Sequence, residues 1–375
     1  MSRSEKRSSP RAGASLQHVE QFWGAALPPA FTHLYTQFAT PFLAPCEFFA
    51  LEAMAAGQGR EFGMLPSFLP FGRAVDEGGL YGFYRTPHNL DGAWPVLYWD
   101  TDEMFLKPVS SDFEAFLRRC VLVGRYETEI QPTEEADGSS GDESTRQIVQ
   151  GMNLPPNLLS GALPRNDSEL YERLAALDPQ DAQSLCHLGC AWRSRGDDER
   201  ALDFFHRASE AAPWFGDPTY LVADVYCARR SFARAVQEWW AVVQCLLPLC
   251  TRTWEWDLGE EHPEADIYEV AADGLSQFEA EATPEMKADP LWSAVVQQDP
   301  YDPNVRERLG QTLLKQGNLP AAEREILNAL SLCGSERGKQ PERLYDALIN
   351  LYAQQGRSHD AAIARHDRAL PRSTV

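Results

Sequence analysis

Apolar positions in the first third of the chain follow two different spacings. Residues 17–42 carry them at helical intervals, and Pro28 and Pro29 restart the chain as a second helix. Short aromatic-rich runs separated by Gly, Pro and Asp then predict the strands of an antiparallel meander, at residues 68–74, 79–86 and 95–101.

An amphipathic helix is expected to close this region. It is predicted over residues 110–124, with Ser110 or Ser111 as its N-cap. The order of helices, strands and helix predicts an α+β domain over residues 15–125. The polar, basic residues 1–14 before it are predicted to be a disordered tail.

The second half of the chain contains an internal repeat. Residues 185–213 align with residues 219–247 at a shift of 34, so that Phe205 corresponds to Trp239. Each copy is typical of two antiparallel helices, in which small residues such as Gly189 lie where the helices approach closely. Two further copies occupy residues 305–333 and 344–370.

These copies resemble the tetratricopeptide repeat, with turn glycines at Gly196, Gly317 and Gly356. The resemblance implies an all-α solenoid over residues 167–372, interrupted by an irregular acidic segment at 253–289. The stretch between the two parts, residues 126–166, is rich in Asp, Glu, Gly and Ser and is predicted to be an acidic flexible linker.

Four segments of the N-terminal domain stand out: "LPPAFTHLYTQF", "FLPFGRAVDEGGLYGF", "PVLYWDTDEM" and "VSSDFEAFL". In their order and spacing they resemble the SUKH superfamily. That superfamily contains the yeast cell-wall assembly regulators and many bacterial toxin-immunity proteins. The resemblance implies protein binding without catalysis, and for immunity-type members the blocking of a toxin.

The formal net charge of −21 argues against a general nucleic-acid binder, because phosphate would be repelled. It suits a basic protein partner, or it serves solubility alone. The first residues lack the apolar core of a secretory signal, and no run of apolar residues is long enough to cross a membrane. The eight cysteines show no short-spaced framework and are expected to be reduced thiols of a cytoplasmic protein.

Carboxylates beside aromatic residues form one candidate partner-binding surface. They would hold a basic partner, such as a nuclease toxin, by electrostatic steering and apolar anchoring. In the alternative interpretation, the aromatic residues belong to core strands and the acids form turns. The candidates are Asp76, Glu77, Tyr98, Trp99, Asp100, Asp102 and Glu103.

The first repeat places Cys186 and Cys190 one helical turn apart, on the face expected to line the concave groove of the solenoid. His187 is rotated about 100° from Cys186 on the helix, so this group falls short of a tetrahedral zinc site. We therefore interpret the two cysteines as packing residues. The residues expected to line the groove are Cys186, Cys190, Arg193, Tyr220, Asp224, Glu307 and Gln311.

The sequence contains no GxxxxGK[ST], GxSxG or HExxH motif, so we expect no enzyme, no cofactor and no metal site. His359 and His366 lie seven residues apart on one predicted helix and are interpreted as part of a solvated face. The first functional hypothesis is an immunity-type or regulatory protein that grips one basic protein while the repeats extend the contact. The alternative is a multi-partner adaptor acting mainly through its repeats. Neither involves nucleic acid or a membrane.

Overall fold

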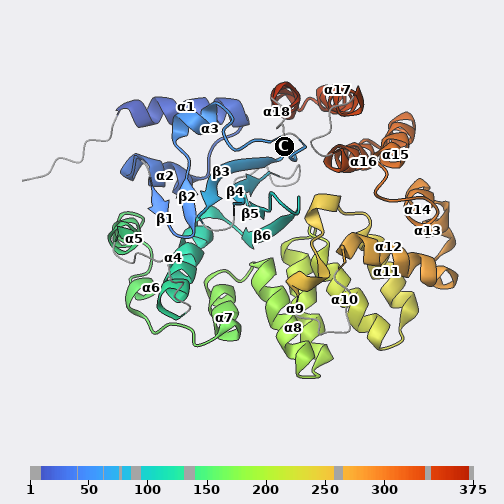
Figure 1. Cartoon of the computed structure of the whole chain (residues 1–375), viewed down its shortest axis with the longest axis horizontal. Coiled ribbons are helices and arrows are strands. Elements are labelled where there is room, and N and C mark those ends of the chain that lie inside the picture. Colours follow the sequence, from blue (N-terminus) through green and yellow to red (C-terminus); the bar gives the residue numbers. More distant parts are fainter. Residues whose placement is uncertain are drawn as a thin grey trace, which may run out of the picture.

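Two architectures follow one another along the chain in the computed structural model. A six-stranded antiparallel sheet with flanking helices comes first, and antiparallel helix pairs follow it (Figure 1). The predicted fold class is thereby confirmed. The structure describes residues 10–39, 41–61, 63–75, 78–85, 94–130, 140–256, 265–333 and 339–370.

The sheet is a meander in which the strands lie in chain order, each antiparallel to its neighbour. The three predicted runs are confirmed as β3 (Phe68–Ala74), β4 (Leu80–Tyr84) and β5 (Val96–Trp99). Their aromatic and β-branched residues suit a pleated, buried surface. The sequence pattern does not predict the other strands, β1 (Phe42–Leu43), β2 (Cys46–Phe48) and β6 (Leu106–Ser110).

Packed aromatic rings hold two helices against one face of the sheet. Phe31 lies 5.2 Å from Phe83 and 5.0 Å from Phe113 between ring centroids, and Phe71 lies 4.8 Å from Phe83. Such tilted and edge-to-face pairs add to the burial of apolar area. We call this part the sheet domain; its helices are α1 (Pro10–Trp23), α2 (Pro29–Gln37), α3 (Leu51–Ala55) and α4 (Phe113–Ile130).

Both ends of the sheet domain differ from the sequence prediction. Helix α1 begins at Pro10, inside the segment predicted as a disordered tail. The predicted N-cap of α4 is wrong, because the Asp112 carboxylate accepts the Ala115 N–H at 2.8 Å. Ser110 instead donates to the Asp112 carbonyl, and Ser111 binds Asp178 in the helical part of the chain. Asp is as good an N-cap as Ser, so sequence alone does not choose between adjacent candidates.

Much of the segment predicted as a flexible acidic linker is helical. Helix α4 continues to Ile130, and α5 (Ser140–Gly151) and α6 (Asn157–Ser160) follow. Apolar side chains on or beside the last two helices are buried, and this packing offsets the acidic composition. They are Ile148, Val149, Leu154 and Leu158.

The helical region, from α7 (Asp167–Leu177) onward, confirms the predicted helix pairs. Gly196, Gly317 and Gly356 form the turns within three pairs with φ of 78°, 77° and 72°, a left-handed conformation that favours glycine. Arg230 takes the equivalent place in the other pair, with φ of 57°. The pairs are α8 (Ala182–Ser194) with α9 (Asp198–Ala211), α10 (Asp217–Ala228) with α11 (Phe232–Val242), α15 (Pro303–Lys315) with α16 (Leu319–Leu332), and α17 (Lys339–Gln354) with α18 (Ser358–Ala369).

Short helices join the second pair to the third. In the described part of the acidic segment, Ile267, Ala271 and Leu275 recur at intervals of four residues and form the buried face of α12. The joining elements are the 3₁₀ helices η1 (Leu247–Leu249), η2 (Thr253–Glu255) and η3 (Glu279–Glu281), and the α-helices α12 (Ile267–Gln277), α13 (Pro284–Ala288) and α14 (Pro290–Val296).

The helical region curves around the sheet domain and covers the second face of the sheet (Figure 1). Every residue of β4 and β5 is buried, although α2 and α4 can cover only one face. Tyr84 of β4 meets Trp214, which follows α9, at 4.9 Å between ring centroids. The arc closes where α18 returns to α1. The inner side of the helical region is therefore occupied by the protein's own sheet.

Candidate protein-interaction surfaces

The two candidate aromatic residues belong to the core of the sheet domain. Tyr98 is 3% exposed and lies 5.4 Å from the ring of Tyr81, with the Lys107 ammonium 5.3 Å from its own ring centroid. Trp99 is fully buried beside Phe68, at 6.3 Å between ring centroids. Neither side chain is available to a partner, so the alternative interpretation as core residues describes them.

Most of the neighbouring carboxylates have internal roles. Asp100 accepts the backbone N–H groups of Asp102 and Glu103 at 3.0 and 2.9 Å, which fixes the turn after β5. Glu103 pairs with Arg252 of the helical region at 3.3 Å. The side chain of Asp102 is exposed. Asp76 and Glu77 lie outside the described residues.

Cys186 and Cys190 lie inside the first helix pair, at 0% and 5% exposure, and do not line an open groove. Burial raises the pKa of the Cys186 thiol well above its usual value, so the thiolate is disfavoured. His187 stacks on Tyr171 at 3.9 Å and contacts Trp256 at 5.0 Å between ring centroids. Burial, reinforced by nearby cations, lowers the pKa of His187 to about 3, so its imidazole is neutral. These residues are packing groups.

The remaining groove candidates also have partners within the chain. Arg193 of α8 forms an ion pair with Asp224 of α10. Glu307 of α15 accepts from Arg343 of α17 at 3.2 Å, and Gln311 donates to Glu307 at 3.3 Å. The contacts of Arg193 with Asp224 and of Arg343 with Glu307 join successive helix pairs, whereas the contact of Gln311 lies within α15. The last candidate, Tyr220, is buried.

Ion pairs and hydrogen bonds join the sheet domain to the helical region. Arg60 donates from Nε and Nη2 to the two carboxylate oxygens of Asp367, each at 2.6 Å, in a pair at most 1% exposed. The residues are separated by 307 positions, so no local sequence pattern could reveal this contact. The other ion pairs across this interface include Arg85–Asp360, Lys107–Glu255 and Arg119–Asp181.

With this geometry in place, comparison with known proteins identifies the first domain. Residues 12–119 match the model of the SMI1/KNR4 family, SUKH-1. The sheet domain is a SUKH-1 domain. The predicted resemblance is thereby confirmed for this part of the chain. No curated protein matches the chain.

Solved structures similar to the chain include helical repeat proteins. One is YrrB, described as a TPR protein with an unusual peptide-binding site, at 17% identity over 54% of this chain and 91% of that chain, with a TM-score of 0.24. Another is the APC/C hetero-tetramer Cut9–Hcn1, at 17% identity over 68% of this chain and 52% of that chain, also with a TM-score of 0.24.

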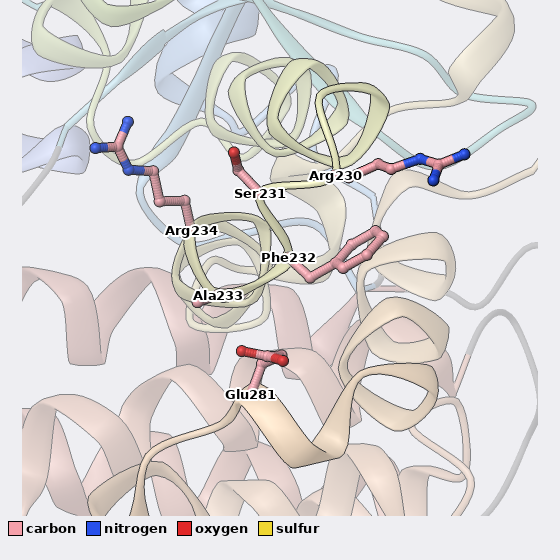
Figure 2. Close-up of a pocket in the computed structure, with 6 residues that line it drawn as sticks. All are labelled: Arg230, Ser231, Phe232, Ala233, Arg234 and Glu281. Atoms are coloured by element: carbon pink, nitrogen blue, oxygen red, sulfur yellow. The ribbon is translucent and has the colours of Figure 1, made fainter.

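Two surface hollows lie among the described residues, one within the helical region and one between α4 of the SUKH-1 domain and helices α6 and α7. The first, of about 250 Å³, lies at the turn between α10 and α11 (Figure 2). Its charged side chains do not converge: Arg230 and Arg234 extend in opposite directions, and Glu281 lies on the far side of the α11 backbone. The second, of about 370 Å³, contains Arg125 and Arg173, both of which donate to backbone carbonyls of its own wall. Neither arrangement builds a ligand site.

Carboxylates without an ion-pair partner among the described residues gather on α12, η3 and α13. Asp273, Glu279, Glu281 and Glu285 are exposed, and we call them the outer acidic surface. In Figure 1, α13 lies at the edge of the arc away from the sheet. The buried acids of α16 and α18 are paired instead: Asp360, Asp367 and Glu325 each form an ion pair with an arginine.

Two further findings concern the described residues. They contain no group of three or more His, Cys, Asp or Glu side chains that could hold a metal ion. Within the same ranges, none of the helices combines the length and the apolar composition that crossing a bilayer requires.

Proposed function

We propose that this protein is a non-catalytic binding protein of the immunity or regulatory kind, which engages a basic protein partner in the cytoplasm. Its SUKH-1 domain and helical repeats indicate a protein-interaction role. The observation that carries the finer proposal is the outer acidic surface, where four exposed carboxylates form no ion pair among the described residues. Carboxylates of this kind attract a positively charged partner and raise the rate of encounter.

The distribution of charge supports the outer surface over the groove. The carboxylates predicted to line the groove are paired internally, as Asp224 is with Arg193 and Glu307 with Arg343. Breaking such pairs to bind a partner would cost the energy that the pairs contribute. The outer acids form no such pair, so a partner that binds them breaks no ion pair there.

The adaptor alternative requires access to the inner side of the helical region. That side is covered by the SUKH-1 domain through Tyr84 and through the ion pairs of Arg60 and Arg85. This burial favours a single-partner binding protein over an adaptor that uses its repeats in the usual way.

Affinity capture from the native lysate at low and high salt, followed by mass spectrometry, tests the proposal. The wild-type protein is expected to retain one basic protein at low salt and to lose it at high salt, because screening weakens attraction between exposed charges. The variant Glu279→Gln/Glu281→Gln/Glu285→Gln is expected to lose this protein at low salt as well.

A matched variant separates a local surface from net charge. Glu172→Gln/Asp203→Asn/Glu210→Gln also removes three negative charges, but from exposed positions on α7 and α9. It is expected to capture as the wild type does. Equal loss in both variants would reduce the effect to net charge, and several partners retained at both salts would favour the adaptor.

A further inference from the structure

Two buried arginines of the SUKH-1 domain are held in place by their own domain. Arg60 donates to the backbone carbonyls of Phe68 and Leu65, and Arg85 donates to the carbonyl of Trp23 at 3.0 Å. These contacts orient both guanidinium groups without help from the helical region. The remaining N–H groups are thereby aimed outward as preformed donors for carboxylates.

Helix α18 supplies the carboxylates. Asp360 and Asp367 are seven residues apart, two helical turns, and therefore share one face. Asp360 pairs with Arg85, and Asp367 pairs through both oxygens with Arg60. The buried Ile363 lies between them in the sequence and completes an acidic amphipathic face.

The surface below α18 is shaped for the close approach of a helix. Gly24 and Gly57 have φ of 66° and 79°, and a Cβ atom on either would overlap a histidine ring of α18. His359 covers Gly24, and His366 covers Gly57 while meeting Phe22 edge-on at 5.1 Å. The face of α18 predicted to be solvated therefore contacts the SUKH-1 domain at His366.

We propose that this surface of the SUKH-1 domain is a binding site for an amphipathic helix with two carboxylates seven residues apart, and that α18 occupies it as a tethered ligand. A partner that presents such a helix would gain the site by displacing α18. The inference does not rest on the proposed function, because it concerns an acidic helix at the inner interface and not a basic protein at the outer acidic surface.

Fluorescence anisotropy with a labelled peptide of residues 356–370 tests this proposal on full-length protein. The variant Asp360→Asn/Asp367→Asn weakens the tethered helix and leaves both arginines in place. It is expected to bind the peptide at least tenfold more tightly than the wild type, in which α18 competes at high effective concentration. A peptide carrying the same two Asn substitutions is expected to bind neither protein.

The control variant is Asp346→Asn, which breaks an exposed ion pair with Arg368 in the same helix pair, at 51% and 41% side-chain exposure. It is expected to behave as the wild type. Equal peptide binding by the wild type and the double variant would overturn the proposal. So would no binding to a folded double variant whose residues 358–369 exchange amide hydrogen rapidly.

A second measurement applies if the double variant does not fold. Excess peptide added to the wild-type chain is expected to accelerate hydrogen exchange at least threefold in residues 358–369, while residues 182–211 remain unchanged. An absence of any change in residues 358–369 at saturating peptide would overturn the proposal by itself.

Discussion

Replacement of Arg60 tests the strength of the buried contact between the SUKH-1 domain and the helical region. Arg60→Met keeps most of the side-chain volume but removes every donor. It leaves the Asp367 carboxylate without its cation in a site at 0% side-chain exposure, and it leaves the Phe68 and Leu65 carbonyls without this donor. A broken buried pair costs about 3–5 kcal/mol, and each unsatisfied acceptor adds about 1–3 kcal/mol. Relaxation recovers part of the sum, and we expect a loss of about 5 kcal/mol.

The converse substitution is expected to be milder. Asp367→Asn keeps one acceptor for Arg60, which also retains its two carbonyl partners, so we expect a loss of about 2–3 kcal/mol. The double variant Arg60→Met/Asp367→Leu removes both charges together, and we expect it to lose at least about 2 kcal/mol less than the sum of the Arg60→Met and Asp367→Leu single variants.

Urea unfolding followed by tryptophan fluorescence provides the four free energies of this cycle. The exposed pair of Asp346 and Arg368 is the reference, and Asp346→Asn is expected to cost less than about 1 kcal/mol. The reasoning would be refuted if Arg60→Met cost no more than Asp346→Asn, or if the two single effects added without coupling.

Three further predictions concern single side chains. Burial lowers the pKa of His187 from 6.5 to about 3, so the unfolded state takes up a proton at a higher pH than the folded state does. The unfolding free energy should therefore fall as pH drops from about 6.5 to 3. In urea titrations at different pH values, His187→Phe should flatten this fall. Burial raises the pKa of Asp217 from 3.8 to about 7, so the folded state keeps this proton to higher pH than the unfolded state does. The unfolding free energy should therefore decline by up to about 4 kcal/mol as pH rises from about 4 to 7. Asp217→Asn should abolish that decline, and an unchanged dependence of the unfolding free energy on pH would contradict the assignment. Gly189→Val should lower the thermal midpoint, because the Phe205 ring lies 2.3 Å from where a Cβ atom would stand and the larger side chain would overpack this contact. The expected cost is about 1–3 kcal/mol. Ala353→Val, on the exposed side of α17, should cost less.

The helix pairs could be predicted from sequence because their determinants are local. A small residue at Gly189 faces Phe205 only sixteen positions later, and the same relation recurs at Gly310 and Ile326. The strands β3 to β5 were also predictable, since each contains several apolar residues between turn residues. Strands of two or three residues, such as β1 and β2, offer too little periodicity.

The covered face of the sheet is what sequence reasoning missed, although a signal was present. Strand β5 reads Val-Leu-Tyr-Trp with no polar alternation, and an unbroken apolar run is typical of a strand buried on both sides. This run by itself indicates a second layer covering the sheet, and such a layer excludes Trp99 as a partner-binding residue. The identity of that layer lay beyond reach, because contacts such as Arg85–Asp360 join positions 275 residues apart.

The central claim is that the helical region closes on the SUKH-1 domain, so that a partner first meets the outer surface of the arc. Zero-length carbodiimide cross-linking of the monomer tests it directly, because Lys107 of β6 lies 3.2 Å from the Glu255 carboxylate of η2. Lys107 is the only lysine between residues 7 and 286, which makes the product simple to assign by mass spectrometry. The account predicts an intramolecular Lys107–Glu255 amide that disappears in Glu255→Gln. If Lys107 couples instead to carboxylates scattered over the chain, or links to Glu255 only between two molecules, the closed arrangement is contradicted.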